Sequence, residues 1–151
     1  MDRQVIRPAT VADVPRLVEM ACRFRRETAY ARRARERPEQ LAALASGLIE
    51  GDRGIMLVAV DVDGAIVGMI GLLVFPHPVS GIDTAGELVW WIEPEQRASG
   101  LGRQLLDYAE AWARQMGAQD VQMIEPVGTG LGQFYTRHGY DALEIAWVKR
   151  L

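Results

Sequence analysis

Residues 93–103 read Glu93-Pro94-Glu95-Gln96-Arg97-Ala98-Ser99-Gly100-Leu101-Gly102-Arg103, and this stretch decides the fold because it joins two segments of different character. The residues before it, 87–93, are nearly all apolar, which predicts a central strand buried on both faces. The residues after it, 101–116, carry apolar side chains at helical spacing, which predicts an amphipathic helix ending at Gly117. A buried strand followed by such a helix indicates a mixed α/β domain.

The turn between strand and helix has the features of a phosphate-binding site. Pro94 ends the strand, and Gly100 and Gly102 let the main chain approach a ligand and adopt angles that other residues resist. The first N–H groups of a helix have no partner within the helix and carry the positive end of its dipole, so they bind phosphate well. Arg97 and Arg103 add positive charge on either side. A tight turn without a ligand is the alternative, but the basic flanks favour phosphate binding.

Two other nucleotide motifs do not fit this turn. The Walker pattern requires a Gly-Lys-Ser/Thr ending, which the chain lacks. The dinucleotide fingerprint requires a third glycine where this chain has Leu105, and it belongs near the first strand of its fold. The sequence therefore predicts a phosphate-containing ligand that neither motif describes.

Apolar spacing and turn residues predict the remaining elements. Thr10 caps a first helix that reaches about Phe24, and Pro38 begins a second helix that ends at Gly51. Asp63-Gly64 is a hairpin turn. The other predicted elements are strands over residues 4–7, 55–62, 65–75, 121–124, 140–143 and 145–148, and a short helix that contains Phe134 and Tyr135.

Length and composition place the chain among ordinary globular proteins. Its 151 residues, 49% of them hydrophobic and 25% charged, predict one domain over residues 1–151. The longest apolar run, Ile66 to Phe75, is too short to span a membrane. No basic segment followed by an apolar one opens the chain, so no signal peptide is expected. We expect a soluble, cytoplasmic protein that does not associate with membranes.

The counts of cysteine, histidine and charge exclude several function classes. With one cysteine, Cys22, and two histidines, His77 and His138, neither an intrachain disulfide nor a zinc site is expected, and we predict no metal. A net charge of -3 argues against a general nucleic-acid binder. Seven arginines nevertheless gather between Arg23 and Arg37. They can recognise an acidic substrate, form a solvated helix face or make a subunit contact.

Two motifs together give a family resemblance. Arg97-Ala98-Ser99-Gly100-Leu101-Gly102 matches the pattern Arg/Gln-x-x-Gly-x-Gly/Ala, and Ile92-Glu93-Pro94-Glu95 matches the lead-in that often precedes it. Phe134-Tyr135-Thr136-Arg137-His138-Gly139-Tyr140 is similar to Phe/Leu-Tyr-x-x-x-Gly-Phe/Tyr. Over nearly its whole length the chain resembles the GNAT superfamily of acetyl-CoA-dependent N-acetyltransferases. The resemblance implies a mixed, mostly antiparallel central sheet with a parallel, splayed strand pair, flanked by about four helices.

The resemblance also implies acetyl-CoA as cosubstrate. In the family, the pyrophosphate of coenzyme A sits on the amides of the turn, and the pantetheine arm pairs with the central strand like an added strand. The cofactor-binding residues implied for the turn are Arg97, Ala98, Ser99, Gly100, Leu101, Gly102 and Arg103, and those for the strand are Trp90, Trp91 and Ile92.

The implied reaction is direct attack of a primary amine, of a small molecule or peptide, on the thioester. Tyr135 matches the family tyrosine that protonates the leaving sulfur, and it would also contact the cofactor; the alternative is a half-buried tyrosine with a satisfied hydroxyl. Glu87, at the start of the predicted strand, is the candidate base, and the alternative is a solvated charge at a strand end. Glu93 is a weaker candidate, expected to reach solvent or the rim of the cofactor site.

One position departs from the family pattern. Many members place an asparagine seven residues before the tyrosine, where this chain has Gly128. This difference keeps open a non-catalytic acyl-CoA-binding regulatory module on the same fold. An RNA-directed or protein-directed modifier that docks through the arginines is a third reading. The resemblance places the acceptor site between residues 24–38 and 76–85, and it allows a homodimer, which is common in the family.

Overall fold

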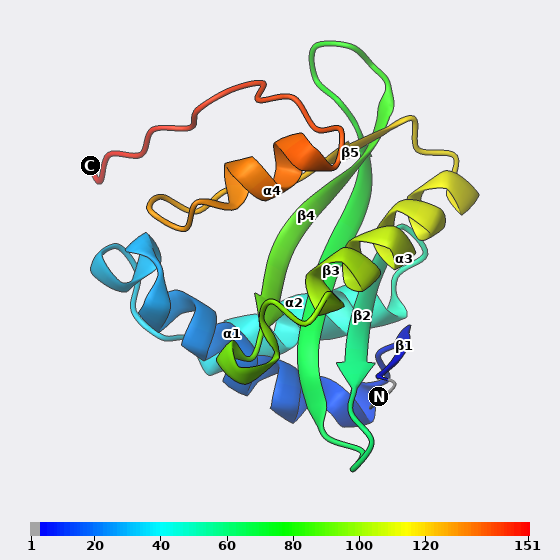
Figure 1. The fold of residues 1–151 in the computed structure, drawn as a ribbon. Helices are drawn as coiled ribbons and strands as arrows, with labels where there is room; N and C mark the ends of the chain where they lie inside the picture. The colour runs from blue at the N-terminus through cyan, green and yellow to red at the C-terminus, as the bar shows by residue number, and fades with distance from the viewer. Residues whose placement is uncertain (1–3) are drawn as a thin grey trace.

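The structure is a computed structural model that describes residues 4–151, and a five-stranded sheet forms its centre (Figure 1). The strands lie in the order β1-β2-β3-β4-β5. All neighbouring pairs are antiparallel except β4 and β5, which are parallel. The strands are β1 (Val5–Pro8), β2 (Gly54–Val60), β3 (Ile66–Pro76), β4 (Asp83–Ile92) and β5 (Asp120–Gln122).

Helices cover both faces of this sheet. Residues within each strand alternate between the two faces, so a strand such as β2 presents apolar side chains to the helices on either side. In β2, Met56 and Val58 pack on the side of α1 and α2, whereas Leu57 and Ala59 pack on the side of α3. Figure 1 shows α4 across the outer ends of β4 and β5. The helices are α1 (Val14–Glu27), α2 (Pro38–Glu50), α3 (Leu101–Gln115) and α4 (Leu131–Arg137), with short 3-10 turns η1 (Val11–Asp13), η2 (Ala29–Arg32) and η3 (Pro94–Gln96). The predicted fold class is confirmed.

Strand β4 bends at its middle and then separates from β5. Its pairing with β3 shifts so that Leu88 has no residue opposite it, and a bulge of this kind bends a strand and increases its twist. The parallel pairing with β5 ends at Gly86, which lies opposite Gln122. Beyond Gly86 the main chain of β4 runs along an open fork between the two strands. This fork positions the site described below.

Two expectations about strands are wrong. Strand β4 begins at Asp83, so Glu87 lies in its interior and not at its start. Residues 138–151 contain no helix or strand, although strands were expected over 140–143 and 145–148. The alternating apolar pattern of the tail is strand-like, but strand propensity acts only where a neighbouring strand provides the pairing. Other boundaries differ from the predicted ones by a few residues, as for α1, which continues to Glu27.

The described part of the chain contains no helix that is both long enough and apolar enough to cross a membrane.

Candidate functional site

The start of α3 presents a row of free main-chain N–H groups. Gly100, at the N-cap, has φ 89°, and Ala98 has φ 62°. Within residues 4–151, the N–H groups of residues 98–103 have no hydrogen-bond acceptor. The positive φ expected at Gly100 is confirmed. Gly102, for which the same was expected, is helical, and the second left-handed residue is instead Ala98, which nothing in the sequence indicated. A Cβ on Gly102 would make ordinary van der Waals contacts with Ile92 (3.4 Å) and the Trp90 ring (3.5 Å), so this position lies against β4.

Two arginines flank this helix start, and other groups fix each of them. The Arg97 guanidinium donates to the main-chain oxygen of Ile92 (2.9 Å) and lies 4.5 Å from the centre of the Trp91 ring. Arg103 donates to Asp107 (2.8 Å) and lies 2.8 Å from the His138 ring nitrogen. Positive charge therefore stands on both sides of the free amides, as the sequence predicted.

A cavity of about 390 Å³ runs from this turn into the fork between β4 and β5. Phe134 from α4 forms part of its wall, a contribution that the sequence analysis missed. Ser99 and Leu101 do not line it, since the Ser99 hydroxyl donates to Gln96 (2.5 Å) and Leu101 is fully buried. The predicted cofactor residues that line the cavity are Trp90, Trp91, Ile92, Arg97, Ala98, Gly100, Gly102 and Arg103.

A second cavity, of about 300 Å³, lies between β4 and the α1–η2–α2 segment. Its floor is apolar and includes Leu41, Met56 and Met69. Four residues line both cavities: Phe24, Glu87, Ile124 and Pro126. The two cavities therefore meet beside Glu87.

Glu87 is buried at this meeting point without an ion-pair partner among residues 4–151. Its side chain comes from the bulged part of β4, and the residue is 8% exposed. Burial raises the pKa of Glu87 to about 8, although the main-chain N–H of Ile124 favours its charged form. Of the two interpretations of Glu87, the solvated charge at a strand end is therefore wrong, and the carboxyl is poised to exchange a proton near neutral pH.

Tyr135 lies next to the meeting point but lines neither cavity. Its hydroxyl donates to the main-chain oxygen of Ile124 at 2.7 Å, and its ring stacks on Trp90 at 6.0 Å. Burial, and then the negative charges of Glu87 and Glu125, raise the pKa of Tyr135. The hydroxyl therefore keeps its proton at physiological pH, and it is hydrogen-bonded to Ile124, a residue that lines both cavities.

Glu93 is a structural anchor and does not reach solvent, so the expectation for this residue is wrong. It is 5% exposed, and Arg16 (2.9 Å) and Arg23, both on α1, pair with its carboxylate. These pairs tie the end of β4 to the first helix, immediately before the turn. The sequence analysis missed Arg16, while Arg23 belonged to the arginine cluster whose role was left open.

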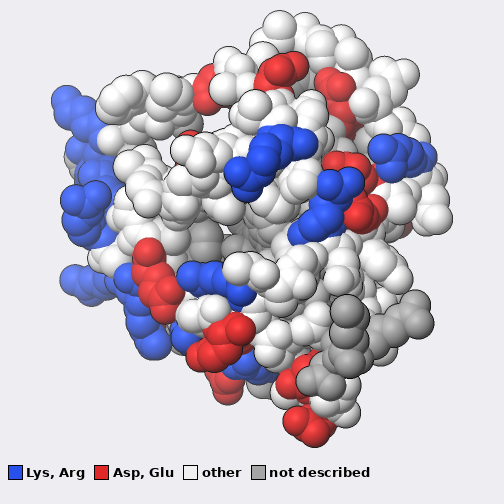
Figure 2. Space-filling model, viewed as in Figure 1, with Lys and Arg blue, Asp and Glu red and all other residues white. Residues whose placement is uncertain are grey.

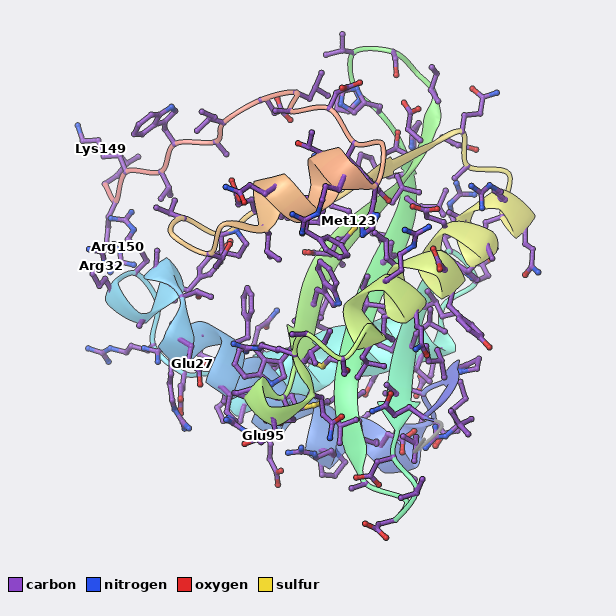
Figure 3. All side chains as sticks on the ribbon, in the orientation of Figure 1. Glu27, Arg32, Glu95, Met123, Lys149 and Arg150 are labelled. Atoms are coloured by element: carbon purple, nitrogen blue, oxygen red, sulfur yellow. The ribbon has the colours of Figure 1, made fainter. Side chains whose placement is uncertain are left out.

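Other members of the arginine cluster surround the second cavity. Figure 2 shows basic side chains gathered at the left of the molecule, where Figure 1 places the end of α1 and η2. Arg25 donates to the main-chain oxygen of Ala34 (2.5 Å) and lies 3.8 Å from Glu36. Arg25, Arg35 and Arg37 line the second cavity, whereas Arg32 does not line it and lies at the left edge of the molecule (Figure 3).

Comparison with known proteins identifies the family. The sequence pattern of the Acetyltransferase (GNAT) family matches residues 16–140. The chain belongs to this acetyltransferase family. The match includes the turn at the start of α3, both cavities and α4. No curated protein matches the GNAT chain in sequence.

Several solved structures share the GNAT fold at low sequence identity. A transcriptional regulator from Bacillus halodurans C-125 is 21% identical, with a TM-score of 0.82, 99% of this chain and 100% of that chain being covered. A ribosomal-protein-alanine N-acetyltransferase from Brucella melitensis biovar Abortus 2308 is 17% identical, with a TM-score of 0.74 and coverage of 99% and 100%. An aminoglycoside N-acetyltransferase, AAC(6')-Iy in complex with CoA, is 14% identical, with a TM-score of 0.80 and coverage of 100% and 96%. These likenesses concern the fold.

The first cavity of this GNAT chain has polar groups that suit coenzyme A. At the start of α3 the main-chain N–H groups of residues 98–103 have no acceptor within residues 4–151, and they suit the pyrophosphate of coenzyme A. Among residues 4–151, no group of three or more His, Cys, Asp or Glu side chains could hold a metal ion.

The glycine-rich segment before α4 forms a helix start of a different kind. Gly128 and Gly130 have φ of 83° and 72°, and α4 begins at Leu131. The carboxylate of Glu125 accepts a hydrogen bond from the main-chain N–H of Gly132. The short helix expected here is confirmed, but a side chain of the same protein already occupies its first turn.

Proposed function

We propose that this chain transfers an acetyl group from acetyl-CoA to a primary amine of a small molecule or peptide, by direct attack of the amine on the thioester. The observation that carries the proposal is the meeting of two cavities at the buried carboxyl of Glu87. One cavity ends at the free amides of the α3 start, and the other opens beside the α1–η2–α2 segment. This arrangement supports a reaction between two ligands that enter from different sides.

The chain's own groups suit the binding of acetyl-CoA, which would supply the acetyl group and a thiolate as leaving group. The amides of residues 98–103, with Arg97 and Arg103, would hold the pyrophosphate. The main chain of Trp90, Trp91 and Ile92, which no longer pairs with β5, would pair with pantetheine like an added strand. Ser99, Leu101 and Tyr135 belong to the same proposed site, the first two through their main chain and Tyr135 through its contact with Trp90.

Glu87 is the proposed base. As the carbon–nitrogen bond forms and the carbon–sulfur bond breaks, the attacking amine loses one proton and the thiolate gains one. A carboxyl with a pKa of about 8 is ionised at mildly alkaline pH and can then accept the proton of the amine. Its position at the meeting of the two cavities supports this role.

Tyr135 is the proposed acid that protonates the departing sulfur. Its hydroxyl is protonated at physiological pH because burial and nearby carboxylates raise its pKa. In this structure the Tyr135 hydroxyl donates to the main-chain oxygen of Ile124, and Ile124 lines both cavities. A change of hydrogen-bond partner, from the Ile124 oxygen to the sulfur, would bring it into the reaction.

A non-catalytic acyl-CoA-binding module is the second candidate function. Gly128, in place of the asparagine usual in the resembled family, and the engagement of the Tyr135 hydroxyl by Ile124 favour it. The proposal otherwise takes residues 1–151 as one domain that acts in the cytoplasm, where its single cysteine, Cys22, would stay reduced. Turnover measurements distinguish the two functions.

Binding of acetyl-CoA is tested by a matched pair of variants. Ser99 and Ser80 each precede a left-handed glycine, but Ser80 lies on the β3–β4 loop and lines neither cavity. Ser99→Asp places a carboxylate beside the free amides of α3, and we expect it to weaken acetyl-CoA binding roughly 30-fold, because it repels and competes with phosphate. Ser80→Asp should leave affinity within about twofold. Titration calorimetry measures both, and equal effects would contradict the assigned phosphate site.

The acid is tested with Tyr135→Phe, which keeps the ring and removes the hydroxyl. We expect kcat to fall by about 10²-fold, the lower end of the range for proton transfer by a positioned side chain, with little change in acetyl-CoA affinity. Tyr108→Phe, on the exposed face of α3, is the control. Unchanged turnover in Tyr135→Phe would remove this residue as the acid. Tight acetyl-CoA binding with no transfer by the wild type to any amine would favour the non-catalytic module.

A further inference from the structure

The second cavity combines an apolar floor with positive charge at its rim. Leu17, Leu41, Met56 and Met69 are among its apolar residues. Arg25 lines it from α1, and Arg35 and Arg37 line it from the segment between η2 and α2. Glu87 is the acidic residue of the lining. The cavity therefore has a carboxyl at its inner end and cationic groups at its outer side.

Two of these arginines have no anionic partner. Arg25 is already engaged by Ala34 and Glu36. Arg35 and Arg37 are exposed, and neither makes an ion pair or a side-chain hydrogen bond within residues 4–151. Their neighbour Arg26, by contrast, pairs with Glu36. Free guanidinium groups beside an apolar cavity suit the carboxylate of a ligand, which they can bind in a two-pronged arrangement.

We infer that the acceptor is a small amine with an apolar body and a carboxylate at the end remote from the amine. Its amine would lie at Glu87, its body on the apolar floor, and its carboxylate against Arg35 and Arg37. A carboxylate next to the amine would instead lie beside Glu87 and be repelled. The inference rests on the proposed acetyl transfer and names the substrate class for that same site. A volume of about 300 Å³ is at the small end for ligand pockets, which fits a compact acceptor.

Three related amines test this inference. The probes are 6-aminohexanoate, its methyl ester, and norleucine, an isomer of 6-aminohexanoate that carries the amine next to the carboxylate. We expect kcat/KM for 6-aminohexanoate to exceed that for the ester and for norleucine by at least about tenfold, which corresponds to roughly 1.4 kcal/mol. Acetyl-CoA-dependent thiol release measures all three. Equal rates for the acid and its ester would overturn the inference while leaving the acetyl transfer intact.

Arginine variants give the second arm of the test. Arg35→Gln combined with Arg37→Gln should remove the preference for the acid over the ester, mainly by raising KM for the acid. Arg32→Gln is the matched control, because Arg32 belongs to the same basic segment but does not line the cavity. A preference that survives in the double variant would overturn the inference. Failure of the wild type to acetylate any of the three amines, and to be stabilised by acetyl-CoA, would instead contradict the proposed function itself.

Discussion

Glu87 and Glu93 are both buried, and they lie at the two ends of one apolar run, but their surroundings differ. Glu93 accepts hydrogen bonds from Arg16 and Arg23, so its charge is compensated. Among the described residues, Glu87 has no such cation, and burial raises its pKa to about 8. The first residue holds the end of β4 against α1, and the second stands where the two cavities meet.

This difference separates a structural carboxylate from a chemically poised one. A buried charge with partners contributes to the geometry of the fold, and removing it leaves its partners uncompensated. Burial without a nearby cation disfavours the ionised form of a carboxyl and therefore raises its pKa. Ionising such a group lowers the stability of the folded state, but the raised pKa makes it a suitable base near neutral pH. The same residue type on one sequence segment therefore predicts opposite effects on stability and activity.

The largest expected effect is on turnover. Glu87→Gln should lower kcat by about 10²–10³-fold, because it removes the group that takes the proton from the amine. Glu93→Gln should leave kcat within about fivefold, since Glu93 contacts α1 and not either cavity. Steady-state rates at saturating acetyl-CoA measure both. Similar losses in the two variants would contradict the distinction between them.

The next effect concerns stability and pH. The pKa of Glu87 is raised from 4.5 to about 8 in the folded state, so between these values the folded chain holds a proton that the unfolded chain has released. Its contribution to stability is therefore present below about pH 4.5 and is lost as pH rises toward 8. Relative to Glu87→Gln, the wild type should lose roughly 2–4 kcal/mol across this window.

Urea unfolding at several pH values measures that loss as the difference between wild type and Glu87→Gln, so that other titrating groups cancel. The kcat/KM of the wild type should rise with pH through a pKa near 8, because the base acts only when it is ionised. Parallel pH–stability curves for the two proteins would show that Glu87 ionises with an ordinary pKa.

The smallest of the three effects is the loss of the anchor. Glu93→Gln should reduce the free energy of unfolding by about 2 kcal/mol, because Arg16 and Arg23 lose a common partner while remaining about one-third exposed. Glu95→Gln, two residues on and exposed, is the matched control and should change stability by less than about 0.5 kcal/mol. Chemical denaturation at pH 7 distinguishes the two, and equal stabilities would mean that solvent compensates both arginines.

The two helix starts show what sequence patterns could and could not predict. Both α3 and α4 begin after a left-handed glycine, Gly100 and Gly130, and both lie in glycine-rich segments. The sequence showed the two basic residues that flank the start of α3, Arg97 and Arg103, and from them it predicted positive charge on both sides of the main-chain amides. The occupation of the second by Glu125 depends on a side chain seven residues away from Gly132, which local spacing does not reveal.

The tail shows a different limit. Residues 140–148 have the alternation of a strand, but a strand needs a partner, and within the described chain none pairs with them. The prediction that Glu93 reaches solvent or the rim of the cofactor site is wrong because alternation within a strand gives only the face on which a side chain lies. The helix that covers that face, with Arg16 and Arg23, decides whether the side chain is buried.

The sequence by itself determined the order of the elements up to α4, the fold class and the turn that precedes α3, because apolar periodicity, proline and glycine act over short distances along the chain. Only the tertiary structure decided that Glu87 is buried without a cation, that Glu93 is paired, and that two cavities meet at one carboxyl. Burial and charge compensation depend on residues brought together from distant segments, so they appear only when the helices have packed onto the sheet.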